Sequence, residues 1–217
     1  MWELKGSGEA RFRVSDWQLQ VRCWPEAIDL IATRGSSRPS AGGLSFVGGR
    51  LPVLEESFIR GDELHLSLPQ AEGQQAALVV VVLVIQADPE CLVIESTLSI
   101  ETMLLDAHPS IELAMAGEGP LMVDVLDSAK VFSRDCSADN ASSQRPRLQV
   151  LVDQRDHCSL DPTCNPMQSL RFFGEFMEKG VIRKTQPWWV WSGSDANAAS
   201  VRQLVLELAR RPLPLAN

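Results

Sequence analysis

A long apolar stretch, residues 77 to 103, constrains the fold of this chain more than any other part of the sequence. Its first arm, Leu78 to Ile85, is an unbroken run of Val, Leu and Ile. Such a run is typical of a central strand covered on both faces, and it is shorter than the roughly 20 apolar residues that a membrane-spanning helix needs. The second arm, Leu92 to Ile100, alternates between apolar and polar residues, as a strand with one buried face does. The turn Ala87-Asp88-Pro89-Glu90 separates the arms, so the stretch predicts an antiparallel hairpin in the core.

Short strands and turns continue along most of the chain. The clearest runs are Trp17 to Cys23, Leu121 to Leu126, Leu148 to Val152, Ser169 to Met177 and Trp188 to Trp191. Regular turn signals between short strands are typical of antiparallel architectures. We therefore expect a mainly β protein, a large antiparallel β-sandwich with a C-terminal α-helix, formed by residues 1–217 as a single domain. A weak division of that domain would fall in the polar loop 135–146.

Two segments are predicted to be helical. Near the C-terminus, Ser194 or Asp195 is a suitable N-cap, and Ala198, Val201, Val205 and Leu208 recur on one helical face. This helix is expected to pack on a sheet face or edge. Near the N-terminus, Pro25-Glu26-Ala27 is expected to open one helical turn that runs to Ile31.

Composition and charge exclude some classes of partner. The formal net charge of the 217 residues is −8, whereas phosphate groups are bound by basic surfaces. Nucleic acid and anionic membranes are therefore not expected as partners. The N-terminal sequence shows no secretory signal, and the five cysteines are too scattered for a disulfide framework, so we expect a cytoplasmic protein with reduced thiols.

A motif in the C-terminal third resembles that of a known protein family. Glu178 to Arg183 reads Glu-Lys-Gly-Val-Ile-Arg, and Thr102 to Asp106 reads Thr-Met-Leu-Leu-Asp. Both strings are similar to those of a family of bacterial proteins with no assigned function. The resemblance implies a large antiparallel β-sandwich similar to galactose-mutarotase-like or carbohydrate-binding sandwiches, and it implies no catalytic residue.

Three tryptophans are the candidate binding residues. Trp188, Trp189 and Trp191 follow the phenylalanines of residues 172–176, and exposed indoles are the surfaces on which proteins stack sugar rings. Adjacent residues on a strand face opposite sides, so one of Trp188 and Trp189 can be buried while the other is exposed. The simpler alternative is that all three tryptophans pack in the core or in a dimer contact.

The candidate catalytic residues for acid–base chemistry are a histidine and a carboxylate. Glu175 and Glu178 could act on a glycosidic or anomeric centre together with His108 or His157. Three residues apart on a strand, the two glutamates would face opposite sides, unless Gly180 marks a bulge. Solvated surface positions are the alternative for both.

Metal and cofactor sites find little support in the sequence. His157, Cys158 and Cys164 have the right chemistry for zinc, but five residues separate the cysteines and no second ligand pair follows. No Walker or G-x-G-x-x-G phosphate loop occurs, so no cofactor is expected.

Two functions from different classes remain open. The first is a non-catalytic binding or assembly module whose partner is a carbohydrate or a protein. The alternative is a mutarotase-like or glycan-processing enzyme that uses a His/Glu pair. An enzyme needs a histidine and a carboxylate on one concave face beside an exposed indole, whereas a binding module does not.

Overall fold

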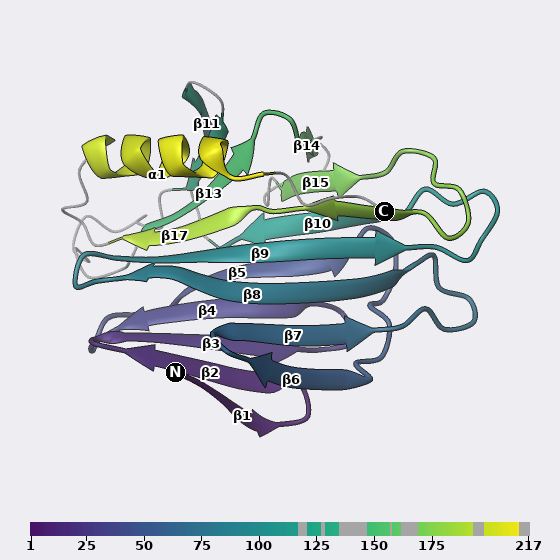
Figure 1. Cartoon of the computed structure of the whole chain (residues 1–217), viewed down its shortest axis with the longest axis horizontal. Helices are drawn as coiled ribbons and strands as arrows, with labels where there is room; N and C mark the ends of the chain where they lie inside the picture. Colours follow the sequence, from purple (N-terminus) through teal and green to yellow (C-terminus); the bar gives the residue numbers. More distant parts are fainter. Residues whose placement is uncertain are drawn as a thin grey trace.

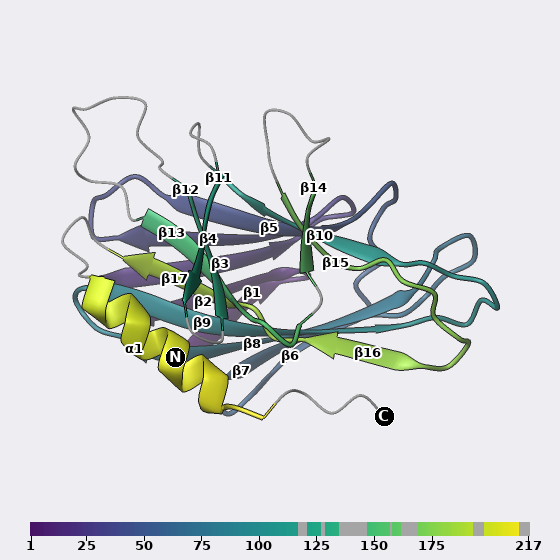
Figure 2. The same cartoon turned by 90° about the horizontal axis from the view of Figure 1, so that it is seen from above.

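The computed structural model describes residues 1–116, 121–126, 129–134, 147–156, 158–161, 169–192 and 198–212. Within these ranges the chain forms two antiparallel sheets and one helix, which lies on the outer side of the second sheet (Figure 1, Figure 2). The predicted fold class, an antiparallel β-sandwich with a C-terminal helix, is therefore confirmed. The helix found in these ranges is not long and apolar enough to span a membrane.

The first sheet contains eight strands, in the order β1 (Trp2–Gly6), β2 (Glu9–Val14), β3 (Trp17–Cys23), β4 (Ile28–Arg34), β5 (Ser40–Phe46), β10 (Ser110–Met115), β15 (Ser169–Phe173) and β14 (Cys158–Asp161). The main path of the second sheet is β11 (Leu121–Leu126), β12 (Ala129–Arg134), β13 (Arg147–Asp153), β17 (Trp188–Ser192), β9 (Cys91–Glu101), β8 (Ala77–Ala87), β7 (Glu63–Leu68) and β6 (Glu56–Arg60). A further strand, β16 (Ile182–Thr185), pairs with β9 next to β17.

The hairpin predicted from residues 77 to 103 is formed by β8 and β9. On β9, the side chains of Leu92, Ile94, Leu98 and Ile100 are fully buried between the sheets. Each such side chain stabilises the fold by roughly 1.5 to 3 kcal/mol. In the turn, the Asp88 carboxylate accepts the backbone N–H groups of Glu90 and Cys91 at 2.8 and 2.9 Å, which fixes the direction in which the chain returns.

The outer face of β8 is less covered than its apolar sequence predicted. Val79 is 39% exposed, and its neighbours across the sheet are Ser67 and Ser99. The helix packs mainly over β12, β13 and β17, and of β8 only Ile85, near the end of the strand, packs against the same apolar cluster. The continuous apolar run therefore corresponds to a strand with one buried face and one partly exposed face.

The segment after Pro25 is a strand and not the predicted helical turn. Trp24 donates its backbone N–H to the carbonyl of Ala27 at 2.8 Å, which closes a tight turn between β3 and β4. From Ile28 onward the buried positions recur every second residue, with Leu30 and Ala32 both at 0% exposure. This two-residue period fits the first sheet, and it overrides the local preference of Pro25 for a helix start.

The C-terminal helix α1 (Ala198–Arg210) covers a second, smaller core. Leu204, Val205 and Leu208 pack against β12, β13 and β17 on the side of the second sheet that faces away from the first. The predicted caps, Ser194 and Asp195, lie outside the described residues, as does the loop 135–146.

Candidate functional site

The candidate site is a pocket of about 600 Å³ at one end of the first sheet. Its polar lining residues are Gln75, His108, Ser110, Ser159, Arg171 and Glu175, and Val47, Cys158, Phe173 and Gly174 complete its wall. The residues come from the end of β5, the start of β10, the end of β15, the start of β14 and the segment before β8. In Figure 1 this is the end toward which β15 points.

Strand register brings these distant segments together. Phe46, Ile111 and Phe172 are neighbours across β5, β10 and β15, and Cys158 pairs with Phe172. Neighbouring strands run in opposite directions, so two strands end where two others begin. Polar residues just beyond these ends converge, although they are far apart in the sequence.

The rim of the pocket is held by main-chain and side-chain hydrogen bonds. Gly174 donates its N–H to the carbonyl of Pro109 at 2.9 Å, and the Ser110 hydroxyl donates to the carbonyl of Phe172 at 3.2 Å. Phe173 and Gly174 have φ angles of 63° and 88°, so the chain leaves the sheet here in a left-handed turn. A Cβ added to Gly174 would lie 3.4 Å from the Ser110 hydroxyl, an ordinary contact distance, so the positive φ rather than crowding favours glycine at this position.

Two of the predicted acid–base residues, His108 and Glu175, line this one pocket. The ring of His108 is exposed and packs at 59° to that of Phe176, with centroids 5.9 Å apart. The carboxylate of Glu175 accepts a hydrogen bond from the Arg183 guanidinium at 2.9 Å and is 59% exposed. The hydrogen bond from Arg183 fixes the position of this carboxylate at the pocket wall.

The other acid–base candidates do not join this pair. β15 ends at Phe173, so Glu175 and Glu178 lie in a turn region and not on the strand that the sequence predicted. Glu178 is exposed and is not part of the pocket wall. His157 lies outside the described residues.

All three candidate binding tryptophans are buried. Trp188 is 1% exposed, and Trp189 and Trp191 are 0% exposed, which agrees with the packing alternative. Trp189 and Trp191 stack between the two sheets, with ring centroids 6.1 Å apart, while Trp188 points outward beneath α1. The prediction that Trp188 and Trp189 face opposite sides is confirmed, but the helix covers the outer one, so none of the three indoles offers a face to a sugar.

Of the three metal candidates, only Cys158 lies among the described residues. Within those ranges no group of three or more His, Cys, Asp and Glu side chains is placed to hold a metal ion. Cys158 lies at the pocket wall, and burial raises the pKa of its thiol, so it stays protonated and weakly reactive. Cys164 lies outside the described residues.

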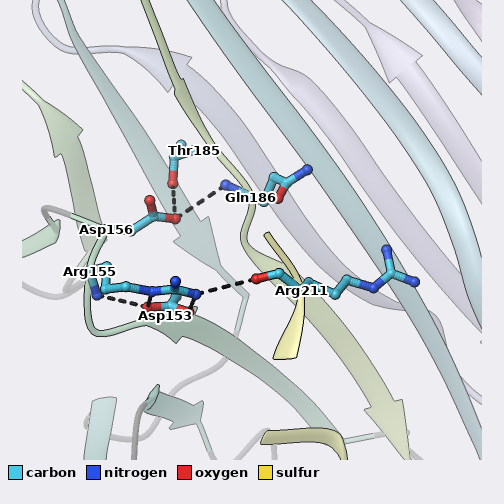
Figure 3. Close-up of polar contacts among 6 residues, drawn as sticks. All are labelled: Asp153, Arg155, Asp156, Thr185, Gln186 and Arg211. Atoms are coloured by element: carbon cyan, nitrogen blue, oxygen red, sulfur yellow. Dashed lines mark hydrogen bonds and ion pairs between the residues drawn. The ribbon is translucent and has the colours of Figure 1, made fainter. Parts of the chain in front are cut away.

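A separate polar cluster lies at the C-terminal end of the helix (Figure 3). Arg155 donates two side-chain hydrogen bonds to the buried carboxylate of Asp153, at 2.9 and 2.7 Å, and one to the carbonyl of Arg211 at 3.3 Å. Next to it, the carboxylate of Asp156 accepts the Thr185 hydroxyl at 2.7 Å and the Gln186 N–H at 3.3 Å. The cluster ties the end of the helix to the second sheet.

The two aspartates of this cluster respond oppositely to their surroundings. The hydrogen bonds from Arg155 hold the pKa of Asp153 below its ordinary value, although burial opposes them. Burial raises the pKa of Asp156, and the hydrogen bonds from Thr185 and Gln186 offset only part of this effect. No pattern in the sequence pointed to this cluster, because it joins three segments through the fold.

Comparison with known proteins gives a likeness in fold. No protein-family model matches the chain, and no curated protein matches it significantly, so the resemblance around Glu178 to Arg183 gains no family assignment. The structure is similar to a crystal structure of a mutant of the heparan sulfate lyase HepC from Pedobacter heparinus, with a TM-score of 0.56 and 8% sequence identity. The match covers 88% of this chain and 36% of the lyase chain. The chain is thus a β-sandwich like one part of a larger polysaccharide lyase.

Proposed function

We propose that this chain is a non-catalytic carbohydrate-binding module and that the pocket beside His108 and Arg171 is its binding site. The observation that carries the proposal is the pocket of about 600 Å³ with six polar side chains in its wall. Its volume lies in the range of sites for small organic ligands. The similarity to part of a polysaccharide lyase supports the same ligand class.

The chemistry of the wall suits sugar hydroxyl groups. Each hydroxyl donates one hydrogen bond and accepts others, and the wall offers an amide from Gln75, hydroxyls from Ser110 and Ser159, and the guanidinium of Arg171. Phe173 adds an apolar surface for the C–H groups of a sugar ring. Glu175 is held in place by Arg183 and accepts hydrogen bonds with its carboxylate.

A second function, a glycan-processing enzyme, is favoured by one observation. His108 and Glu175 line the same concave surface, which is the arrangement that acid–base catalysis on a sugar needs. No exposed indole lies in the wall of this pocket, although Phe176 packs against His108. Binding without turnover distinguishes the module from the enzyme.

Isothermal titration calorimetry tests the proposal with cellohexaose, xylohexaose, chitohexaose and a heparin-derived hexasaccharide. We expect saturable binding to at least one of them, weakened about tenfold or more by His108→Ala or Gln75→Ala. The matched controls, His65→Ala on β7 and Gln203→Ala on α1, lie outside the pocket wall and should bind as the unchanged protein does.

The same samples decide between the two functions. Chromatography of each sugar after long incubation should recover it unchanged, and a new product that disappears in His108→Ala would establish the enzyme instead. If none of the four sugars binds at millimolar concentration, the proposed function is wrong.

A further inference from the structure

We infer that Trp24 forms a second sugar-contacting site, so that the module binds an oligosaccharide along the outer face of the first sheet. This inference rests on the proposed function of the pocket. Trp24 is 52% exposed, whereas Trp2, Trp17, Trp188, Trp189 and Trp191 are at most 4% exposed. Single exposed apolar residues are common on protein surfaces, so exposure alone would not make Trp24 a binding residue.

The orientation of Trp24 is fixed by its surroundings. Its indole Nε1 donates a hydrogen bond to the Asp29 carboxylate at 3.0 Å, and its backbone N–H is held by Ala27. The ring is therefore presented to solvent in a defined position before any ligand arrives. Pre-positioned aromatic side chains lose little conformational entropy when they bind.

Trp24 lies at the same end of the first sheet as the pocket. It follows the end of β3 and precedes the start of β4, where Ile28 pairs with Leu44 on β5. Phe46 of β5 in turn pairs with Ile111 of β10, close to His108 and Ser110. Two strand spacings, about 10 Å, separate β4 from β10, a span that suits a short oligosaccharide better than a single sugar.

One part of the pocket wall faces the same side of the sheet as Asp29. Asp29 lies between the buried residues Ile28 and Leu30, so its side chain points to the outer face. Arg171 lies between the buried residues Leu170 and Phe172 and also points outward. A sugar chain can therefore contact both without passing around an edge of the sheet.

A loop that contains two glycines lies between the two places. Val47 lines the pocket and donates its N–H to the carbonyl of Ser110 at 3.0 Å, while Leu51 donates to the carbonyl of Pro25 at 2.8 Å, next to Trp24. Between them lie Gly48 and Gly49, and a Cβ added to either would meet no atom within 4 Å.

Polar groups around the indole suit sugar hydroxyls. Asp29 supplies a carboxylate beside the ring, and Glu26 and Arg50 are 67% and 78% exposed with their charged ends 3.9 Å apart. The indole face would stack on the C–H face of a pyranose ring, and these groups would contact its edge. The sequence suggested the same combination for Trp188, Trp189 and Trp191, which are buried.

The test compares each hexasaccharide with its monosaccharide, namely glucose, xylose, N-acetylglucosamine or glucuronic acid. Trp24→Ala should weaken binding of the hexasaccharide about tenfold and leave binding of the monosaccharide unchanged, whereas Trp24→Phe should keep most of the affinity. Phe58→Ala, which removes a 38% exposed ring on β6 of the other sheet, is the matched control.

A fluorescence measurement reports on the indole itself. Acrylamide should quench mainly Trp24, because the other five tryptophans are buried, and a bound hexasaccharide should reduce that quenching. Equal hexasaccharide affinity in Trp24→Ala and the unchanged protein, with His108→Ala still deficient, overturns the Trp24 site alone. Loss of binding in Trp24→Ala but not in His108→Ala would instead remove the pocket from the proposal.

Discussion

The indole nitrogen of Trp188 donates a hydrogen bond to the carboxylate of Glu95, on the neighbouring strand, at 3.0 Å. The same carboxylate accepts a hydrogen bond from Arg211 at 2.7 Å, and the guanidinium of Arg211 lies 5.1 Å from the centre of the Trp188 ring. Glu95 is thus the buried anion to which the end of α1 is attached. The helix is held by charge as well as by its apolar face.

Replacing Glu95 with glutamine should weaken this attachment. The amide keeps the volume but removes the charge that pairs with Arg211, and we expect a loss of about 2 kcal/mol in the free energy of unfolding. Urea denaturation measures it. Glu207→Gln on α1, where the carboxylate accepts a hydrogen bond only from Gln203 among the contacts described, is the control. An equal effect of both changes would contradict the role of Glu95.

Asp156 should make the protein less stable as the pH rises. Because burial raises its pKa in the folded state, its contribution to stability is complete below the ordinary pKa of an aspartate and is lost as the pH rises through the raised value. Asp156→Asn can still accept from Thr185 and Gln186 without a buried charge. We expect it to be more stable than the unchanged protein at pH 7, with a difference that shrinks toward about pH 4.

Asp153 should behave in the opposite way. Its pKa is lowered by Arg155, so its contribution is complete above the ordinary aspartate pKa and is lost as the pH falls through the lowered value. Asp153→Asn is therefore expected to cost about 1 to 3 kcal/mol at pH 7 and less in acid. Thermal unfolding of Asp153→Asn and Asp156→Asn between about pH 4 and pH 7 measures how the stability difference from the unchanged protein depends on pH. If this dependence had the same sign for both variants, the opposite pKa shifts of the two aspartates would be refuted.

Gly42 should not tolerate a side chain. A Cβ at this position would lie 2.1 Å from the Trp189 ring, which packs on the glycine from the opposite sheet, so Gly42→Ala should cost about 3 kcal/mol. Gly43→Ala on the outer face is the matched control, because its Cβ would make only ordinary contacts, at 3.6 Å or more. Chemical denaturation of the pair should separate them clearly, and similar midpoints would show that the two sheets are less tightly packed here.

Glu175→Gln separates binding from catalysis at the pocket. For a binding module, the amide still accepts hydrogen bonds, so we expect the affinity for the bound hexasaccharide to fall only a few-fold. Glu178→Gln, outside the pocket wall, should have no effect. A sugar-cleaving activity that Glu175→Gln lowers by about a thousandfold would identify the residue as a catalytic acid or base.

The local sequence pattern was sufficient to predict where several strands lie. It was not sufficient to predict what covers their faces. The period-two pattern of Leu92 to Ile100 and the opposite facing of Trp188 and Trp189 were both predictable. The burial of Trp188 was not, because it depends on a helix that packs on it from later in the chain. The left-handed turn at Phe173 and Gly174 ends β15 earlier than predicted. Gly174 was the one residue in the sequence that indicated this turn.

The pocket lies beyond what a single sequence reveals. Gln75, His108, Ser159 and Arg171 are ordinary polar residues in four separate segments, and only the strand order makes them neighbours. The pairing of His108 with Glu175 was one of several combinations that the sequence allowed. Trp24 precedes the segment for which the sequence predicted a helical turn, and its hydrogen bond to Asp29, five residues later, depends on the tight turn that forms there instead.

The position of β17 in the second sheet has a consequence for how the chain folds. Trp188 on β17 is the cross-strand partner of Glu95 on β9, which lies 93 residues earlier in the sequence. In the second sheet β17 lies between β9 and β13. The inner edges of both partners stay open until this late segment inserts, so the topology has a high contact order and predicts slow folding. Substitutions that delay the insertion would lengthen the life of an intermediate with two unpaired edges, and aggregation during refolding should then increase even when the native state is unchanged.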